Sequence, residues 1–274
     1  MPTVTVSDIS IYYESHGEGE PLVLIMGYGG SSGQWFSQIP GLSQEYRVVA
    51  FDNRGTGRSD KPDVPYTMQM LAEDVSGLLE ALAIDAAHVY GVSMGGMIAQ
   101  ELALRHPDKV LSLILGCTSH GGPNSILADA EALAILFDPE RAKVPPEQKA
   151  RDLVPFLYTQ KFIDNNPDIV EQYIAKTLEY VTPVLGFRRQ SQAIMAHDTY
   201  HRLPQIKVPT LVIAGTADRL IPVENSRLIA SRMPNAELVL LENVGHGFFT
   251  EALEEANKAV LDFLGRHSRP RWAM

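Results

Sequence analysis

The chain has 274 residues, of which 45% are hydrophobic and 20% are charged, and its formal net charge is −10. This composition is typical of a soluble globular protein, and the length suffices for one large domain without disulfides or metals. The excess of acidic over basic residues, 33 against 23, argues against nucleic acid as a partner, because that binding needs concentrated Lys and Arg contacts.

The chain has no pattern of a secreted or membrane protein. Residues 1–8 lack a basic stretch followed by an apolar run, and no segment approaches the ~18 uninterrupted apolar residues that cross a bilayer. The single cysteine, Cys117, cannot form an internal disulfide and suits a reducing compartment. We therefore expect a cytoplasmic protein without membrane partners, with the basic stretch Arg266 to Arg271 as a solvated chain end.

Short apolar runs alternate with helix-like segments in the first part of the chain. Alternating runs at 3–6 and 9–13 predict a hairpin of half-buried strands. Short apolar runs, typical of strands covered on both faces, follow at 21–25, 46–51, 87–90 and 110–115. Helical periodicity separates them at 33–43, 66–82 and 94–106, so we expect an α/β fold with a mostly parallel sheet flanked by helices.

The alternation stops after Cys117 and resumes at 209–215, followed by a helix from Glu224, a strand at 237–241 and a helix from Glu251. The intervening segment has helix-like spacing at 126–137, 146–158, 169–180 and 186–197. We interpret residues 119–205 as a helical cap inserted into a core of residues 1–118 and 206–274.

A serine lies where the run at 87–90 ends. Gly91-Val92-Ser93-Met94-Gly95 stands between this predicted strand and a predicted helix. Such a turn strains the serine backbone, and side chains two positions away on either side would collide with neighbouring backbone. The bare pattern is weakly specific, but its position between a strand and a helix predicts that Ser93 is a nucleophile.

A serine nucleophile needs a base and a group that orients the base. Asp218 follows the strand predicted at 209–215, and His246 follows the next one, between glycines. Alone, Asp218 is typical of an Asx turn and His246 of a solvated loop. The order Ser, Asp, His favours a catalytic triad, in which His246, with a pKa expected near ~6 to 7, takes the proton of Ser93 and Asp218 orients His246.

The reaction also needs hydrogen-bond donors for an oxyanion, and these are usually backbone amides. The glycine-rich stretch at 26–30 follows the strand predicted at 21–25. It predicts that the N–H groups of Tyr28 and Met94 form the oxyanion hole. Without the serine motif, the same stretch would indicate only a loop of turn residues.

His197 and His201 are four residues apart, a spacing that would place two metal ligands on one helical face. No H-E-x-x-H motif or suitably spaced carboxylate accompanies them. We therefore predict no metal and no other cofactor.

Over nearly its whole length, the sequence resembles the capped serine esterase and lactonase branch of the α/β-hydrolase superfamily. The segment at 52–59 is similar to that branch's D-x-R-G-x-G-x-S motif, and the segments around Asp218 and His246 are similar to its acid and base loops. The resemblance implies an eight-stranded sheet with a helical cap between strands six and seven. One departure is Met26-Gly27, where the family often has His-Gly.

The resemblance also narrows the activity. Haloalkane dehalogenases and epoxide hydrolases carry aspartate at the position of Ser93, which makes those activities unexpected here. Esterases, lactonases of enol or acyl-homoserine lactones, C–C bond hydrolases and cofactor-free perhydrolases remain, with a receptor-like ligand-binding module as the non-enzyme alternative. We expect a serine hydrolase that cleaves hydrophobic carboxylic esters or lactones through an acyl-enzyme. The sequence does not define the oligomeric state.

Overall fold

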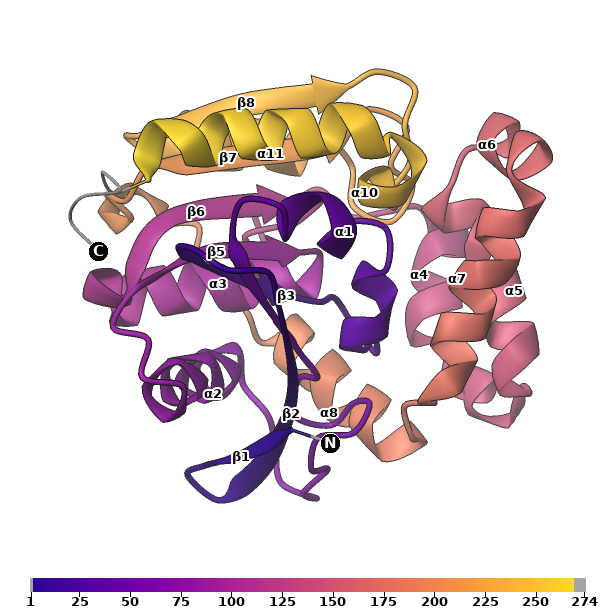
Figure 1. The fold of residues 1–274 in the computed structure, drawn as a ribbon. Coiled ribbons are helices and arrows are strands. Elements are labelled where there is room, and N and C mark those ends of the chain that lie inside the picture. The colour runs from indigo at the N-terminus through magenta and orange to yellow at the C-terminus, as the bar shows by residue number, and fades with distance from the viewer. Residues whose placement is uncertain (1, 269–274) are drawn as a thin grey trace.

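The computed structural model describes residues 2–268 (Figure 1). Its strands form one eight-stranded sheet in the order β1-β2-β4-β3-β5-β6-β7-β8. They span β1 (Thr3–Val6), β2 (Ile9–His16), β3 (Pro21–Ile25), β4 (Arg47–Phe51), β5 (Ala87–Val92), β6 (Val110–Gly116), β7 (Thr210–Gly215) and β8 (Ala236–Leu241). Pairing is antiparallel between β1, β2 and β4 and parallel from β4 to β8, which confirms the predicted mostly parallel sheet.

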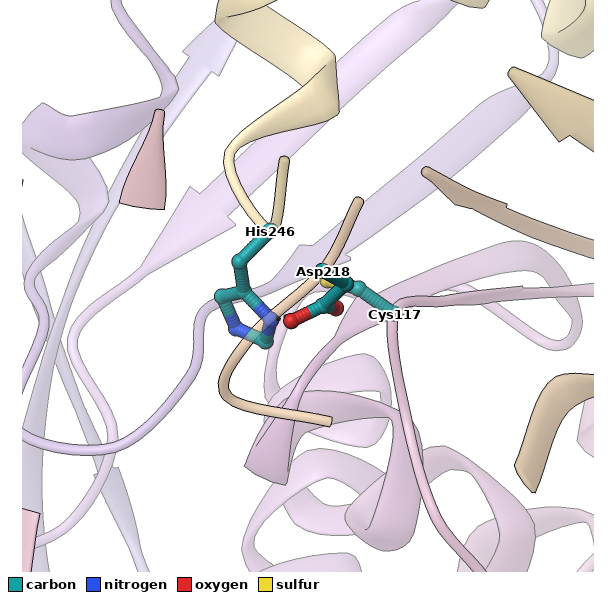
Figure 2. Close-up of side chains that lie close together, drawn as sticks. All are labelled: Cys117, Asp218 and His246. Carbon is teal, nitrogen blue, oxygen red and sulfur yellow. Dashed lines mark hydrogen bonds and ion pairs between the residues drawn. The ribbon is translucent and has the colours of Figure 1, made fainter. Parts of the chain in front are cut away.

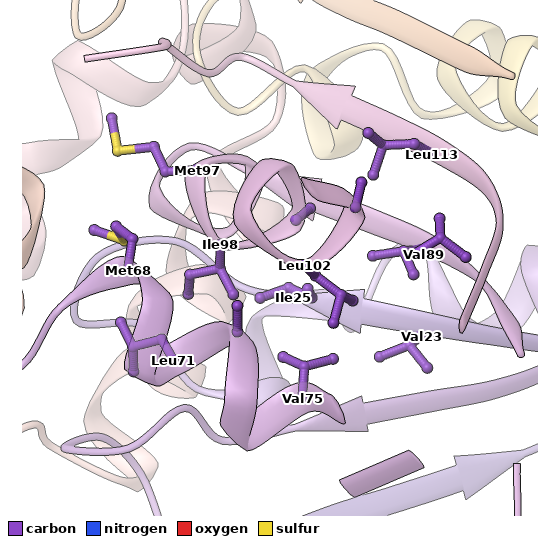
Figure 3. Packing of buried hydrophobic residues seen from close by; sticks show 14 of the residues in the cluster. Val23, Ile25, Met68, Leu71, Val75, Val89, Met97, Ile98, Leu102 and Leu113 are labelled. Carbon is purple, nitrogen blue, oxygen red and sulfur yellow. The ribbon is translucent and has the colours of Figure 1, made fainter. Parts of the chain in front are cut away.

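Both faces of the sheet are covered because successive strand residues point to opposite sides. Val23 and Ile25 join the apolar cluster under α2 (Met68–Ala81), α3 (Met94–Arg105) and α9 (Glu224–Arg232). Leu22 and Leu24 join the cluster under α1 (Ile39–Leu42) and α11 (Leu253–His267). Figure 3 shows side chains of α2 and α3 packed against strand residues in the first cluster. The helix residues include Met68, Leu71, Val75, Ile98 and Leu102, and the strand residues include Val89 and Leu113.

The chain between β6 and β7 is helical. It forms α4 (Ala130–Phe137), α5 (Pro146–Leu157), α6 (Gln160–Asn165), α7 (Pro167–Glu179) and α8 (Val184–Met195). Helices α4 to α7 stand to one side of the sheet (Figure 1) and share their own apolar cluster. We refer to residues 119–205 as the inserted segment; their assignment as a cap remains a prediction.

Several expected boundaries differ from the observed ones. The stretch predicted as one helix at 33–43 is a 3-10 turn (Ser32–Trp35) followed by the four-residue α1, because Pro40 lacks a backbone donor and Gly41 is a poor helix former. The last helix begins at Leu253, after the separate α10 (Phe248–Glu251). The short α6, capped by the Thr159 hydroxyl, was not predicted.

The basic stretch predicted as a chain end lies partly outside the described residues, which stop at 268. Within residues 2–268, no helix is both long and apolar enough to cross a bilayer.

Substitution of Gly95 tests how closely α3 packs against the sheet. A Cβ on Gly95 would overlap the carbonyl oxygen of Ile25 at the end of β3. We expect Gly95→Ala to lower the free energy of unfolding by about 1–3 kcal/mol, because backbone must move to relieve the overlap. Gly265→Ala is the matched control: nothing lies within 4 Å of its added Cβ in α11, so stability should rise by up to about 1 kcal/mol. Urea unfolding measures both, and equal effects of the two substitutions would contradict this packing.

Candidate active site

The candidate site residues follow the carboxyl ends of neighbouring parallel strands. Because β3, β5, β6, β7 and β8 run in the same direction, these ends meet at one edge of the sheet. Ser93 follows β5, Asp218 lies three residues beyond β7, and His246 lies five residues beyond β8. The stretch at 26–30 follows β3 at the same edge.

Ser93 has the strained backbone that its motif predicts. Its φ is +56° and its ψ −124°, and α3 begins at the next residue. The Ser93 N–H donates to Gly116 O at 2.9 Å, and Ser93 O accepts from the Thr118 hydroxyl at 2.7 Å. A Cβ on Gly91 would overlap Gly95 O, so the tight turn depends on a glycine there. The surrounding contacts thus hold Ser93 at the start of α3.

Asp218 and His246 form a buried hydrogen-bonded pair (Figure 2). His246 Nδ1 lies 2.7 Å from Asp218 Oδ2. The other carboxylate oxygen accepts from the backbone N–H groups of Leu220, at 2.8 Å, and Ile221, at 2.9 Å. Asp218 is therefore both a turn residue and the partner of His246. The two interpretations of Asp218 weighed from the sequence are compatible, because its two oxygens serve different partners.

Burial and charge act in opposite directions on His246. Burial of the imidazole, the largest single cause, lowers the pKa of His246, whereas Asp218 and Cys117 raise it. The net direction is upward from the ordinary value. Asp218 favours the imidazolium, the form that a general base acquires when it takes a proton. We expected an ordinary pKa for His246 from the sequence, and the direction in the structure is upward from the ordinary value.

Cys117 is the residue of this cluster that sequence reasoning missed. It follows β6 directly, has a φ of +38° and is fully buried. Its Sγ, an Asp218 oxygen and a His246 ring nitrogen lie within 4.8 Å of one another. Burial raises the pKa of the Cys117 thiol, which favours the neutral form. Its position directly after a strand, like that of Ser93, was the available sequence signal.

The spacing of Cys117, Asp218 and His246 is also one that a metal ion could use. The carboxylate is already shared between His246 and two backbone amides, which favours a hydrogen-bonded pair over a metal centre. His197 and His201, the other metal candidates, lie beyond the end of α8 at Met195 and share no helical face. His197 is buried, whereas His201 is exposed.

The stretch at 26–30 lies against Ser93. A Cβ on Gly27 would be 3.0 Å from Ser93 Cβ and 3.4 Å from Ser93 Oγ. Gly30 N donates to Gly27 O at 3.2 Å, which closes a turn around Tyr28 and Gly29. The hydrogen bonds of residues 2–268 include none donated by Tyr28 N or by Met94 N, the first amide of α3. Within residues 2–268, neither predicted oxyanion donor is thus engaged in a hydrogen bond to the protein.

The inserted segment contacts the loop that carries His246. Gly247 N donates to Leu157 O at 2.7 Å. The Glu251 carboxylate accepts from Gly245 N at 2.9 Å and from Thr159 N at 3.3 Å. These bonds fix the residues on both sides of His246 against the end of α5.

Comparison with known proteins agrees with this geometry. A sequence model of the α/β-hydrolase fold matches residues 20–253. The chain belongs to the α/β-hydrolase family. The α/β-hydrolase chain is 34% identical over 261 residues to a Stutzerimonas stutzeri protein with the provisional name carbamate hydrolase RutD, covering 93% of this chain and 96% of that one.

Two solved structures share the same architecture. The enol-lactonase from Burkholderia xenovorans is 29% identical with a TM-score of 0.86, over 96% of this chain and all of that one. An N-acyl homoserine lactone degrading enzyme is 30% identical with a TM-score of 0.81, at the same coverage of 96% and 100%. The family and these relatives together show that the protein is a hydrolase.

The Asp218 charge should control the titration of His246. We expect Asp218→Asn to lower the pKa of His246, because burial then acts without the carboxylate that opposes it. An NMR titration of the imidazole measures this change. Asp164→Asn removes the same charge from an exposed position on α6 and should leave His246 unchanged, because solvent and salt screen it. An unaltered His246 titration in the Asp218 variant would contradict the assigned cause.

Proposed function

We propose that the protein hydrolyses carboxylic esters or lactones through an acyl-enzyme. Ser93 attacks the carbonyl carbon, and His246 takes the hydroxyl proton and later returns it to the leaving oxygen. Asp218 orients His246 and stabilises its imidazolium. The N–H groups of Tyr28 and Met94 donate to the oxyanion of the tetrahedral intermediate. Water then attacks the acyl-Ser93 ester, assisted by His246, and releases the acid.

The observation that carries this proposal is the 2.7 Å hydrogen bond between His246 Nδ1 and Asp218 Oδ2. It leaves Nε2 of His246 as the basic nitrogen, which is the tautomer that a serine nucleophile needs. The strained Ser93 at the start of α3 supports it, because the helix N-terminus favours the negative charge that develops on the carbonyl oxygen. Since the neutral imidazole is the base, activity should fall as pH drops through the His246 pKa.

Aromatic rings around Tyr28 support an apolar substrate. The Tyr28 ring lies 5.7 Å from Phe137 of α4 and 5.3 Å from Phe187 of α8, measured between ring centroids. Most other apolar residues near the ends of α4 to α6 pack within the inserted segment, among them Ile135, Leu136, Phe156, Leu157, Tyr158 and Phe162. Similarity to an enol-lactonase and to an N-acyl homoserine lactone degrading enzyme favours lactones within this class.

A carbamate is the second candidate substrate. The observation that favours it is the 34% identity to the relative with the provisional name carbamate hydrolase, over 93% of this chain. A carbamate carbonyl is open to the same serine attack, with a carbamoyl-enzyme in place of the acyl-enzyme. The same residues would therefore serve either substrate.

A fluorophosphonate probe tests the nucleophile and its substrates on one sample. We expect intact mass to show one adduct, located at Ser93 by peptide mapping, and turnover within a panel of p-nitrophenyl esters, acyl lactones and aryl carbamates. Ser93→Ala should abolish labelling and lower turnover by several orders of magnitude, with residual activity from the oxyanion hole.

Ser76→Ala is the matched control, because Ser76 is a buried serine on α2 that bonds to Lys109. It should label and turn over like the wild type. Labelling at another residue, or retention of most activity by the Ser93 variant, would overturn the nucleophile. Labelling without turnover of any panel member would overturn the substrate class and leave Ser93 as the reactive group.

A further inference from the structure

The turn that carries the Tyr28 N–H has a conformation that its own hydrogen bond does not fix. Gly29 has a φ of +69° and Tyr28 is not among the residues with positive φ, which is the pattern of a type II turn over residues 27–30. A type I turn can have the same closing hydrogen bond with the central peptide turned over. Glycine at position 29 permits the type II form, and contacts from outside the turn add to that preference.

Gln190 of α8 supplies one such contact. Its side chain is fully buried, and its Oε1 accepts from Gly29 N at 2.9 Å. Its Nε2 donates to Arg54 O at 3.0 Å. Arg54 is itself held by a buried pair of bonds to Asp74, at 2.7 and 2.8 Å. Gln190 thus links the central peptide of the turn to a rigid part of the core.

Thr182, just before α8, supplies the second contact. Its hydroxyl donates to Gly29 O at 2.9 Å. A Cβ on Gly29 would overlap the Phe187 ring, and the Tyr28 hydroxyl donates to Phe187 O at 3.2 Å. Both polar groups of Gly29 are therefore bonded to the inserted segment, about 150 to 160 residues away along the chain.

We propose that Gln190 and Thr182 are positioning residues that hold the turn at 27–30 so that the Tyr28 N–H faces the oxyanion. This inference rests on the proposed function. The peptide bond between Gly27 and Tyr28 is planar and trans, so its N–H and its carbonyl point in opposite directions. Because Gly27 O faces into the turn and accepts from Gly30 N, the Tyr28 N–H points out of the turn. Gln190 holds the N–H of the central peptide, between Tyr28 and Gly29, and Thr182 holds the carbonyl of the next peptide. Both contacts therefore oppose a flip of the central peptide and a shift of the turn relative to Ser93.

Loss of the Gln190 or Thr182 contact should destabilise the transition state and leave substrate binding nearly unchanged. A misplaced oxyanion donor weakens a hydrogen bond that forms only when charge develops on the carbonyl oxygen. Loss of the positioning contact should therefore lower kcat and leave KM nearly unchanged. It should also weaken binding of an alkylboronic acid, whose tetrahedral adduct on Ser93 resembles the transition state.

The test uses isosteric variants of the full-length protein with matched controls. Gln190→Met and Thr182→Val remove the polar contacts while conserving volume, and Thr182→Ser keeps the donor. Gln100→Met and Thr199→Val are the controls: both are fully buried, bond to each other and link α3 to the inserted segment, but neither contacts the turn. Thermal unfolding of each variant separates misfolding from misplacement.

We expect kcat on the preferred ester or lactone to fall about 10-fold to 100-fold in Gln190→Met and Thr182→Val, with KM nearly unchanged. Thr182→Ser and both controls should keep the wild-type kcat. Unchanged kcat in both positioning variants, a change confined to KM, or an equal loss in the controls would overturn the positioning role alone. A wild type without turnover on the whole panel would overturn the proposed function, and this inference with it.

Discussion

The strained backbone of Ser93 is the constraint on which the rest of the site depends. A non-glycine residue at φ +56° and ψ −124° costs on the order of 1–3 kcal/mol, and it persists only where the surrounding structure imposes it. Here β5 and α3 are both buried, and side chains at Gly91 and Gly95 would overlap backbone. The strained Ser93 lies at the N-terminus of α3, the position at which we propose that it acts as the nucleophile.

Parallel pairing brings the acid and base loops to the sheet edge where Ser93 lies, and the base loop has one non-glycine residue with positive φ, Asn243 at +60°. Adjacent strands end at the same edge, so each loop needs only to carry one side chain and to be held in place. The inserted segment bonds to two of these loops. Leu157 bonds to Gly247 and Thr159 to Glu251, beside His246, and Thr182 and Gln190 bond to Gly29 in the turn at 27–30. The segment therefore contributes contacts that fix the geometry of the candidate site.

The sequence predicts the sheet and the order of the candidate site residues, because both depend on local patterns. Apolar runs mark the strands, and glycines around Ser93 and His246 mark the loops. It does not predict Cys117 beside His246 or the contacts of Gln190, since these depend on which distant segments meet in three dimensions. Periodicity also missed the break around Pro40, where local backbone chemistry overrides the apolar spacing. The shared helical face considered for His197 and His201 is absent, because α8 ends before both residues.

The central claim is that Ser93 carries the acyl group during turnover. Rapid mixing with an excess of a p-nitrophenyl ester, followed by acid quench and mass spectrometry, measures this directly. The account predicts a p-nitrophenol burst of about one equivalent and a mass gain equal to the acyl group, mapped to the peptide containing Ser93. Turnover with no adduct on Ser93, or with an adduct on Cys117 instead, would contradict it.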